Sequence, residues 1–232
     1  ITRTAGSLPN GNRGLPAVMD APGRVLSVRG ARGVSLIDLT GATPRVSRTG
    51  SVSAHRLWSN GTVLPNGEVV VTGGSGVDGA IFQGVLRDVA YHAEIWSPTT
   101  GSWRRGASAA KPRLYHSVSL LLPDATVLTA GGGAPGPVTN LNAEIYYPPY
   151  LYKKDGSGQL APRPTIVSAP TSLPRTGSFQ VQVGSGQRIG TVTLIRTGAP
   201  THSFDADQRR MPLAFRQDGA RPCGAHASLI DG

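Results

Sequence analysis

The feature that most constrains this sequence is an internal repeat. Residues 63–74 and 121–132 each contain an apolar strand, a turn made of Pro-Asn or Pro-Asp, a second β-rich strand and a double glycine. The Leu-Pro pairs begin at Leu64 and Leu122, so the period is 122 − 64 = 58 residues. Short strands and tight turns repeated at this spacing predict several copies of one small antiparallel sheet.

Each copy then ends in the pattern Ala-Glu-Ile, aromatic, any residue, Pro, at residues 93–98 and 143–148. A weaker copy occupies residues 15–46, and Trp103 follows the first full copy as the start of a last strand. Four strands with a double glycine and a late tryptophan are typical of a kelch blade of a β-propeller. About three blades are present, and three blades do not close a ring, so we expect the chain to be incomplete at its N-terminus.

Composition agrees with strands and turns, because 31 glycines and 19 prolines accompany only 16% charged residues. After Tyr152 the pattern changes, and residues 153–158 form a polar, turn-rich linker. Strands are then predicted at 178–183, 191–196 and 213–215. This part of the chain resembles a small β-sandwich with several strands missing.

The predicted fold class is therefore all-β, a partial kelch β-propeller of about three blades followed by a β-sandwich that is truncated. We predict propeller blades over residues 1–152, an incomplete sandwich domain over 153–220 and an atypical tail over 221–232. Within the propeller part, residues 51–105 and 113–150 should each form a four-stranded antiparallel meander.

The charge balance is basic, with 23 Lys and Arg against 13 Asp and Glu and a net charge of +10. The arginines are scattered and no stacking aromatic residues lie among them, so a solvated basic surface is favoured over nucleic-acid binding. We expect no nucleic-acid partner, and no apolar run has the length of a membrane span. Cys223 is the only cysteine, which excludes an intrachain disulfide framework.

Three residues are candidates for chemistry. Tyr115 and His116 precede a strand of the second full copy, and His202 follows a strand that ends in Leu-Ile-Arg. Imidazole nitrogens and a phenolate oxygen can all bind a transition metal. Adjacent residues of a regular strand point to opposite faces, so Tyr115 and His116 can share a metal only at an irregular strand start, which Pro112 permits.

Each candidate also has a purely structural interpretation. In the preceding copy the matching Arg-Leu pair is followed by Trp58, so Tyr115 can be a packing aromatic common to the blades. His202 can be an ordinary loop residue, whereas the preceding copy has no histidine aligned with His116. His55 and His92 are interpreted as surface or packing residues.

Three runs of the sequence, at residues 113–124, 143–152 and 194–210, resemble the C-terminal half of galactose oxidase and its glyoxal oxidase relatives. The resemblance covers roughly residues 15–220 with the motifs in the same order. It implies a seven-bladed propeller followed by an immunoglobulin-like domain, with copper on the propeller axis. It also implies that residues 153–220 form that immunoglobulin-like β-sandwich.

The same resemblance assigns roles residue by residue. Tyr115 corresponds to the axial tyrosine and general base, and His116 to an equatorial ligand. His202 corresponds to the second histidine, on a loop that reaches the propeller from the appended domain. The family also has a radical cofactor, a tyrosine cross-linked to a cysteine, but this sequence has no tyrosine before Tyr91 and no cysteine before Cys223.

The resemblance therefore implies a fragment of a copper-radical oxidase that oxidises a small alcohol, aldehyde or carbohydrate with O₂ and releases H₂O₂. We expect the isolated chain to be a monomer that binds Cu(II) weakly and shows no oxidase activity, and the whole protein to be secreted or extracellular. The alternative is a non-catalytic kelch propeller that binds carbohydrate or protein at the cell surface. Convergence of Tyr115, His116 and His202 on one point would favour the oxidase.

Overall fold

A computed structural model describes most of the chain. The described residues are 14–29, 32–77, 86–173, 177–217 and 224–228. Their fold is all-β, with several antiparallel sheets, none of them closed, and one short 3₁₀ turn. No helix in the described part of the chain is long and apolar enough to cross a membrane.

The chain divides into two compact units. The first contains residues 1–149 together with 195–210, and the second contains residues 150–194 and 211–232. The segment 195–210, which carries His202, is therefore part of the first unit although the strands on either side of it run into the second.

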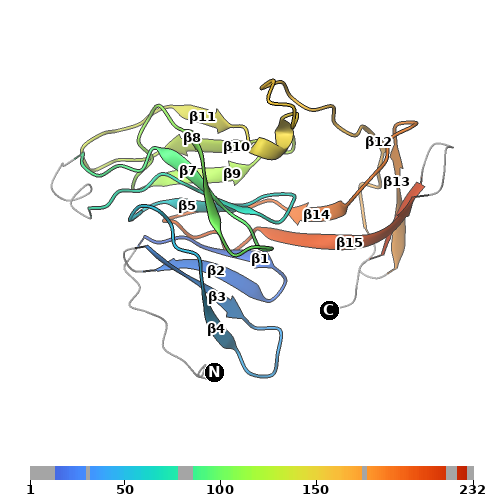
Figure 1. The fold of residues 1–232 in the computed structure, drawn as a ribbon, viewed down its shortest axis with the longest axis horizontal. Helices are drawn as coiled ribbons and strands as arrows, with labels where there is room; N and C mark the ends of the chain where they lie inside the picture. The colour runs from blue at the N-terminus through green and yellow to red at the C-terminus, as the bar shows by residue number, and fades with distance from the viewer. Residues whose placement is uncertain (1–13, 30–31, 78–85, 174–176, 218–223, 229–232) are drawn as a thin grey trace. The chain divides into compact units, whose positions relative to one another are not determined.

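The first unit begins with a four-stranded antiparallel sheet in the order β1-β2-β3-β4 (Figure 1). Its strands are β1 (Ala17–Ala21), β2 (Arg24–Arg29), β3 (Gly33–Asp38) and β4 (Arg45–Thr49). This sheet is the weak first copy of the repeat, and all four strands follow one another as a meander.

The second sheet repeats the same meander in the order β5-β6-β7-β8. Its strands are β5 (Asn60–Val63), β6 (Val69–Thr72), β7 (His92–Trp96) and β8 (Trp103–Ser108). The four-stranded meander predicted for residues 51–105 is present, with its last strand ending three residues later.

The third sheet has three strands, not the four predicted for residues 113–150. They are β9 (Ser117–Leu121), β10 (Val127–Gly131) and β11 (Ala143–Tyr146). Pro148 and Pro149 follow β11, and because proline has no backbone N–H it cannot continue a hydrogen-bonded ladder. The chain instead enters the 3₁₀ turn η1 (Pro149–Leu151), whereas the second copy turns at the same place into β8.

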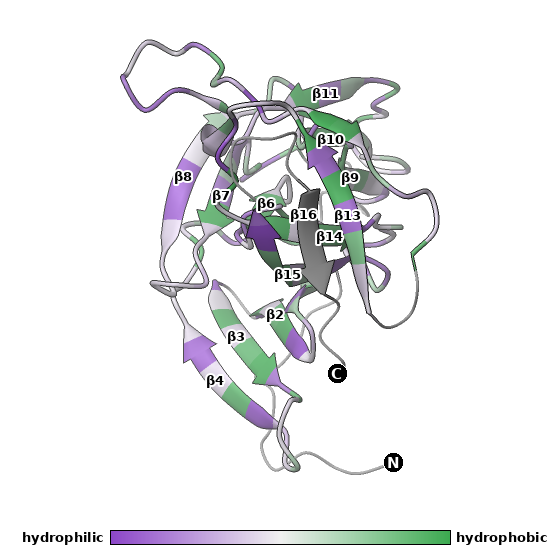
Figure 2. Ribbon diagram, turned by 90° about the vertical axis from the view of Figure 1, so that its right-hand side faces the viewer, coloured by the Kyte–Doolittle hydropathy of each residue, from purple (hydrophilic) through white to green (hydrophobic). Residues whose placement is uncertain are grey.

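The second sheet lies between the other two, and this explains its burial. Strand β5 contacts β1 on one side and β9 on the other. Every residue of β5 and β6 is therefore buried, while the outer strands β4 and β8 alternate between exposed and half-buried residues. Figure 2 shows the hydrophilic residues that interrupt β8 and β4.

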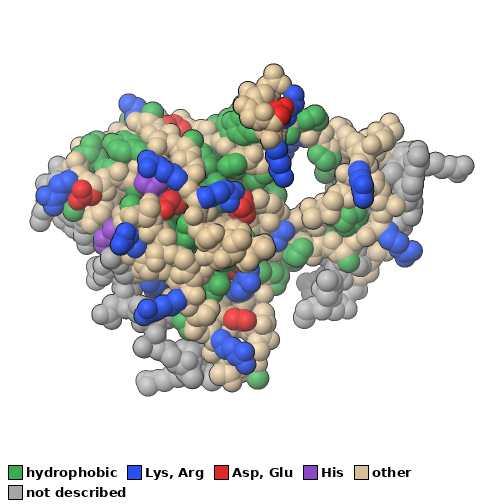
Figure 3. Space-filling model, viewed as in Figure 1, with side chains coloured by type: hydrophobic (Ala, Val, Ile, Leu, Met, Phe, Trp, Pro, Cys, Tyr) green, Lys and Arg blue, Asp and Glu red, His purple; other side chains and the backbone are tan. Residues whose placement is uncertain are grey.

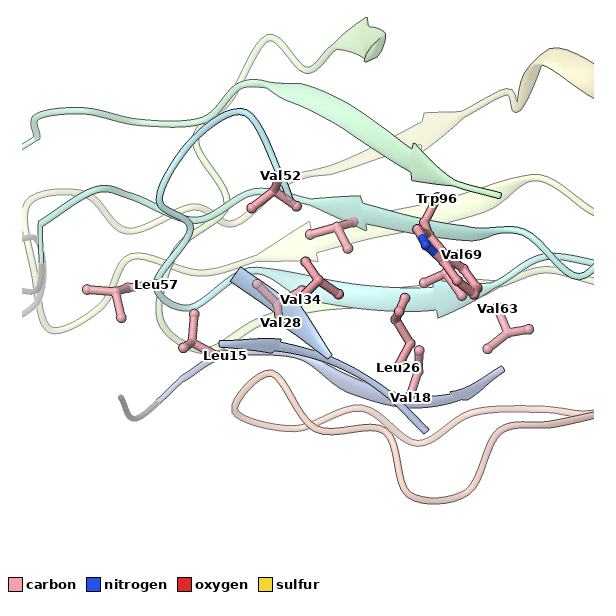
Figure 4. Close-up of a cluster of buried hydrophobic side chains, with 11 residues drawn as sticks. Leu15, Val18, Leu26, Val28, Val34, Val52, Leu57, Val63, Val69 and Trp96 are labelled. Carbon is pink, nitrogen blue, oxygen red and sulfur yellow. The ribbon is translucent and has the colours of Figure 1, made fainter. Parts of the chain in front are cut away.

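Two different interfaces join these sheets. Between the first and second sheets lies the hydrophobic core, to which Val18, Leu26, Val63, Val69 and Trp96 contribute (Figure 4). Between the second and third sheets the contact is polar and buried.

In that polar interface, Asn60 donates to the Ser117 hydroxyl over 2.9 Å, and the Thr62 and Ser119 hydroxyls are 2.7 Å apart. These hydrogen bonds tie β5 to the beginning of β9.

A buried arginine explains why the repeat keeps its glutamate, and the same arginine also donates to a carbonyl of the double glycine. Arg56 donates to Glu94 over 2.8 Å and to the Gly73 carbonyl over 3.0 Å. One repeat later, Arg113 donates to Glu144 over 2.9 Å and to the carbonyl of Gly131 over 3.1 Å. Both arginines are buried, so each needs this set of acceptors.

The second unit contains one five-stranded sheet in the order β12-β13-β16-β15-β14. The strands are β12 (Ile166–Ser168), β13 (Ser178–Val183), β14 (Val192–Arg196), β15 (Arg209–Gln217) and β16 (Gly224–Ser228). Strand β13 has the predicted bounds, and β14 begins one residue after its predicted start.

Strand β16 pairs antiparallel with both β13 and β15, so part of the predicted atypical tail lies inside this sheet.

The lysine and arginine side chains are spread over the face shown in Figure 3, without one dominant cluster there.

Candidate metal centre

Tyr115 and His116 occupy the two central positions of a β-turn that leads into β9. The Ser117 amide donates to the Leu114 carbonyl over 2.9 Å, and His116 has a φ of 65°. A positive φ at the third residue is the type II conformation, which glycine usually adopts. This turn is the irregular strand start that the sequence requires if both residues are to face one point. The Tyr115 and His116 ring centroids are 3.8 Å apart.

The preceding repeat has the same turn. There the Ser59 amide donates to the Arg56 carbonyl over 3.3 Å, and Trp58 has a φ of 64°. When the two repeats are aligned on their turns, Trp58 corresponds to His116. When they are aligned on their Arg-Leu pairs, Trp58 corresponds to Tyr115.

The mismatch arises from one extra residue in the copy that contains Tyr115. From the buried arginine to the Leu-Pro pair the spacing is 122 − 113 = 9 in that copy and 64 − 56 = 8 in the preceding one. The turn therefore begins one residue later after the arginine, and Tyr115 occupies the turn position that Leu57 has in the preceding copy. The Trp58 ring packs edge-on against Tyr115, with centroids 4.6 Å apart.

His202 lies at the tip of a two-residue turn. The backbone of Thr201 and that of Phe204 exchange two hydrogen bonds of 2.8 Å each, which closes the turn. The two central residues, His202 and Ser203, have φ of 50° and 72°. Positive φ at both positions is the type I′ conformation, normally built from Asn and Gly. The histidine is therefore held in a backbone conformation that its side chain disfavours.

A buried carboxylate organises the loop around this turn. One oxygen of Asp205 accepts from the backbone amides of Ala199 at 3.3 Å, Asp207 at 3.2 Å and Gln208 at 3.0 Å. A Cβ atom at Gly198 would overlap the same carboxylate, so glycine is required there. We call residues 195–210 the His202 loop.

Gln208 fixes the His202 loop to the second sheet. Its side-chain oxygen accepts from the Val63 amide at 2.8 Å, and its side-chain nitrogen donates to the Val63 carbonyl at 2.9 Å. The Gln208 side chain thus pairs with β5 as a neighbouring strand would, and it is only 1% exposed.

Arg210 adds a second anchor two residues later, because its Nε donates to the Pro65 carbonyl over 2.9 Å. Burial lowers the pKa of the Arg210 guanidinium, and the negative charge of Asp20 opposes this shift. Burial in turn raises the pKa of Asp20, against the lowering effect of Arg24 and Arg210.

The two turns bring Tyr115, His116 and His202 together. The His116 and His202 ring centroids are 5.0 Å apart, and the Tyr115 and His202 centroids are 5.4 Å apart. Tyr115 is half-buried and both imidazoles are exposed. All three residues belong to the first unit.

This donor set fits copper. Two imidazoles and a phenol supply the N and O donors that Cu(II) prefers. His116 and His202 both have positive φ, and strain of this kind concentrates at functional sites. Among the described residues no group of three or more His, Cys, Asp or Glu side chains is placed to hold a metal, so a site here depends on the phenol as well.

The remaining histidines do not join this cluster. His92 lies in β7, where its Nε2 is 3.1 Å from the Ser53 hydroxyl. His55 is half-buried in the segment before the Trp58 turn. The side chain of His226 and the whole of Cys223 lie outside what the structure describes.

Three further residues shape the centre, and sequence patterns alone hardly indicate them. Trp58 packs on Tyr115, Thr201 contacts the His202 ring and Gln208 anchors the loop. Only Trp58 has a sequence signal, since it is an aromatic residue at the corresponding turn of the preceding repeat.

Comparison with known proteins connects this arrangement to one group. The profile of the galactose oxidase-like early set domain matches residues 163–229. Galactose oxidase of Gibberella zeae is 34% identical over 166 residues, which is 71% of this chain and 24% of that protein. Aldehyde oxidase GLOX1 of Arabidopsis thaliana is 24% identical over 194 residues, covering 77% of this chain and 31% of its own length.

A solved structure agrees over almost the whole chain. A fungal alcohol oxidase of the AA5 family, in complex with copper, matches with a TM-score of 0.81 and 26% identity. The match covers 94% of this chain and 47% of that protein. The chain thus spans from about a quarter to about half of the length of these relatives.

The antiparallel meanders and the match of residues 163–229 to the early set profile make the chain similar to the galactose oxidase-like all-β proteins. The chain is a homologue of galactose oxidase and of the glyoxal oxidases.

Proposed function

We propose that this chain carries the copper-binding segment of an oxidase that acts on an alcohol or hydrated aldehyde. The substrate loses one hydrogen from its carbon and one from the hydroxyl on that carbon, which becomes a carbonyl or carboxyl carbon. O₂ takes up both hydrogens as H₂O₂. The observation that carries the proposal is the approach of Tyr115, His116 and His202 to within 5.4 Å of one another, measured between ring centroids.

In this proposal His116 and His202 hold Cu(II) through ring nitrogens and Tyr115 through its Oη. Copper supplies one-electron redox chemistry that no side chain provides. Tyr115 has a second role, in which its Oη accepts the hydroxyl proton of the substrate. Trp58 packs on the Tyr115 ring and covers part of it from water.

The rest of the proposal concerns the whole protein. We infer that the three sheets of the first unit are kelch blades of a larger propeller. We also infer that the substrate is a small alcohol, aldehyde or carbohydrate, and that the protein is a secreted or extracellular monomer. The names of its homologues, galactose oxidase and aldehyde oxidase, support this substrate class.

The isolated chain should bind copper weakly and should not turn over. Tyr115, His116 and His202 are only part of the donor set that the resemblance implies. The family's radical cofactor is a tyrosine joined to a cysteine, and this sequence has no tyrosine before Tyr91 and no cysteine before Cys223. Without a second one-electron store, the two-electron oxidation of an alcohol is not completed. Assays of H₂O₂ release with simple alcohols and aldehydes should therefore be negative.

Copper binding itself is the decisive test. Cu(II) titration of the metal-free chain, followed by calorimetry and electron paramagnetic resonance, should show one site with hyperfine coupling to two nitrogens. His116→Ala and His202→Ala should each remove one nitrogen and weaken binding at least about tenfold.

Tyr115→Phe should weaken binding and leave both nitrogen couplings in place. His92→Gln is the matched control and should bind copper as the unchanged chain does. A site that survives both His116→Ala and His202→Ala would refute the assignment.

A further inference from the structure

Thr201 makes the one direct hydrogen bond to the His202 ring that the structure describes. Its hydroxyl oxygen lies 2.7 Å from Nδ1 of His202. Both residues are exposed, yet the backbone of Thr201 is fixed by the two hydrogen bonds that close the turn with Phe204. Thr201 is also β-branched, so its χ1 is restricted and its hydroxyl oxygen has few alternative positions.

The two nitrogens of an imidazole are not equivalent, and the partner of one decides what the other can do. If Nδ1 carries the proton, it donates to the Thr201 hydroxyl and the lone pair of Nε2 is free to bind a metal. If Nε2 carries the proton, Nδ1 accepts from the hydroxyl and neither nitrogen is available. As long as the Thr201 hydroxyl stays hydrogen-bonded to Nδ1, His202 can therefore bind a metal only when Nδ1 carries the proton.

We propose that Thr201 is a positioning residue that holds His202 with its proton on Nδ1 and so presents Nε2 to copper. The claim that Nε2 is presented to copper rests on the proposed function. The claim that Thr201 orients the His202 ring does not. Hydrogen bonds of this kind to metal-binding histidines fix the tautomer and the ring orientation, and their loss costs about 10- to 100-fold in metal affinity.

The His202 loop makes this role specific. Asp205 and Gln208 already fix the backbone through buried hydrogen bonds that do not involve the His202 side chain. Loss of the Thr201 hydroxyl should thus free the ring without releasing the loop.

The tautomer can be measured without any metal. Long-range ¹H–¹⁵N correlation spectra of the metal-free chain, with His202→Ala for assignment, show which ring nitrogen carries the proton. The unchanged chain should show protonated Nδ1 on His202, and Thr201→Ser should keep it. Thr201→Val, which keeps the branched shape and removes the hydroxyl, should shift the population toward protonated Nε2.

Copper titration provides the second readout. Thr201→Val should weaken Cu(II) binding about 10- to 100-fold, and Thr201→Ser should restore it to within a few-fold. Thr40→Val is the matched control, because it removes an exposed threonine hydroxyl that bonds to Asp38 instead. All these variants should melt at the same temperature as the unchanged chain.

The outcomes separate the two claims. Protonated Nε2 on His202 in the unchanged chain would overturn the proposal, and so would a Thr201→Val variant with unaltered copper affinity and tautomer. A chain that shows protonated Nδ1, loses it in Thr201→Val and binds no copper would refute the proposed metal site while supporting the hold of Thr201 on the ring.

Discussion

Replacing Gln208 by leucine removes the pair of hydrogen bonds that fixes the His202 loop to β5. Both bonds end on Val63, which is itself only 1% exposed, so water does not replace them. Leaving a buried N–H and a buried C=O without partners costs about 1–3 kcal/mol each. The added apolar surface of leucine returns about 1 kcal/mol. We therefore expect Gln208→Leu to lower the free energy of unfolding of the first unit by about 3 kcal/mol.

Urea unfolding followed by tryptophan fluorescence measures this loss directly, because Trp58, Trp96 and Trp103 all belong to the first unit. Hydrogen exchange of the Val63 amide gives a site-specific readout and should become faster in the variant. The matched control is Gln159→Leu, which removes an exposed side-chain amide that accepts from Lys153 over 2.7 Å. That variant should change the stability by less than about 0.5 kcal/mol.

The result that would refute this reasoning is a loss below about 0.5 kcal/mol together with unchanged exchange at Val63. If Gln208→Leu does not fold, Gln208→Asn provides a milder test. Its amide is one methylene shorter, so it should lose at least one of the two bonds and show a smaller loss in the same direction.

Two further predictions concern the buried charges of the second sheet. Glu94→Ala should destabilise the first unit by about 3–5 kcal/mol in urea unfolding, because it leaves Arg56 buried without its carboxylate partner. Glu68→Ala, which breaks the more exposed pair with Arg104, should cost at most about 1 kcal/mol, and equal losses would contradict the argument. Burial, followed by the charges of nearby arginines, lowers the pKa of His92 below its ordinary value of 6.5. The unfolded chain therefore binds this proton more readily. The stability contributed by neutral His92 is full above pH 6.5 and is lost as the pH falls below 6.5 and through the lower pKa of the folded state. His92→Gln should flatten the fall of stability between pH 7 and pH 5, and an unchanged pH profile would refute this cause.

Strand positions were predictable because they depend on local patterns. The alternation of Phe179, Val181 and Val183 identified β13, and the two Leu-Pro turns located the hairpins of the second and third sheets. Pro148 and Pro149 mark the missing fourth strand of the third sheet in the sequence itself. The repeat pattern nevertheless favours a fourth strand, because the preceding copy has one at the same place.

Long-range pairs were not predictable in the same way. Arg56 and Glu94 are far apart in the sequence, and nothing in either segment distinguishes a buried arginine from a solvated one. Gln208 lies 145 residues from Val63, and its role depends on the free edge of β5, which exists only after the sheet has formed.

For the candidate site, the residue types and the resemblance to galactose oxidase point to Tyr115, His116 and His202 as copper donors. Pro112 permits the irregular strand start that such a site needs. The φ values of His116 and His202 and the contact between Thr201 and the ring need the folded backbone. The single-residue insertion beside Tyr115 is present in the sequence, but alignment on the Arg-Leu pairs conceals it.

At this centre the residues with a strained backbone are not the residues whose side chains anchor it. His116, His202 and Ser203 each adopt a positive φ, which costs a non-glycine residue about 1–3 kcal/mol. Backbone hydrogen bonds close these turns, and the chain around them is anchored by neighbours that carry no candidate ligand atom, namely Arg113, Asp205 and Gln208. Because the anchors are buried and the imidazoles are exposed, the backbone is fixed before any metal binds. The folded protein therefore stores the cost of bringing the donors together, and a metal that binds there need not supply it.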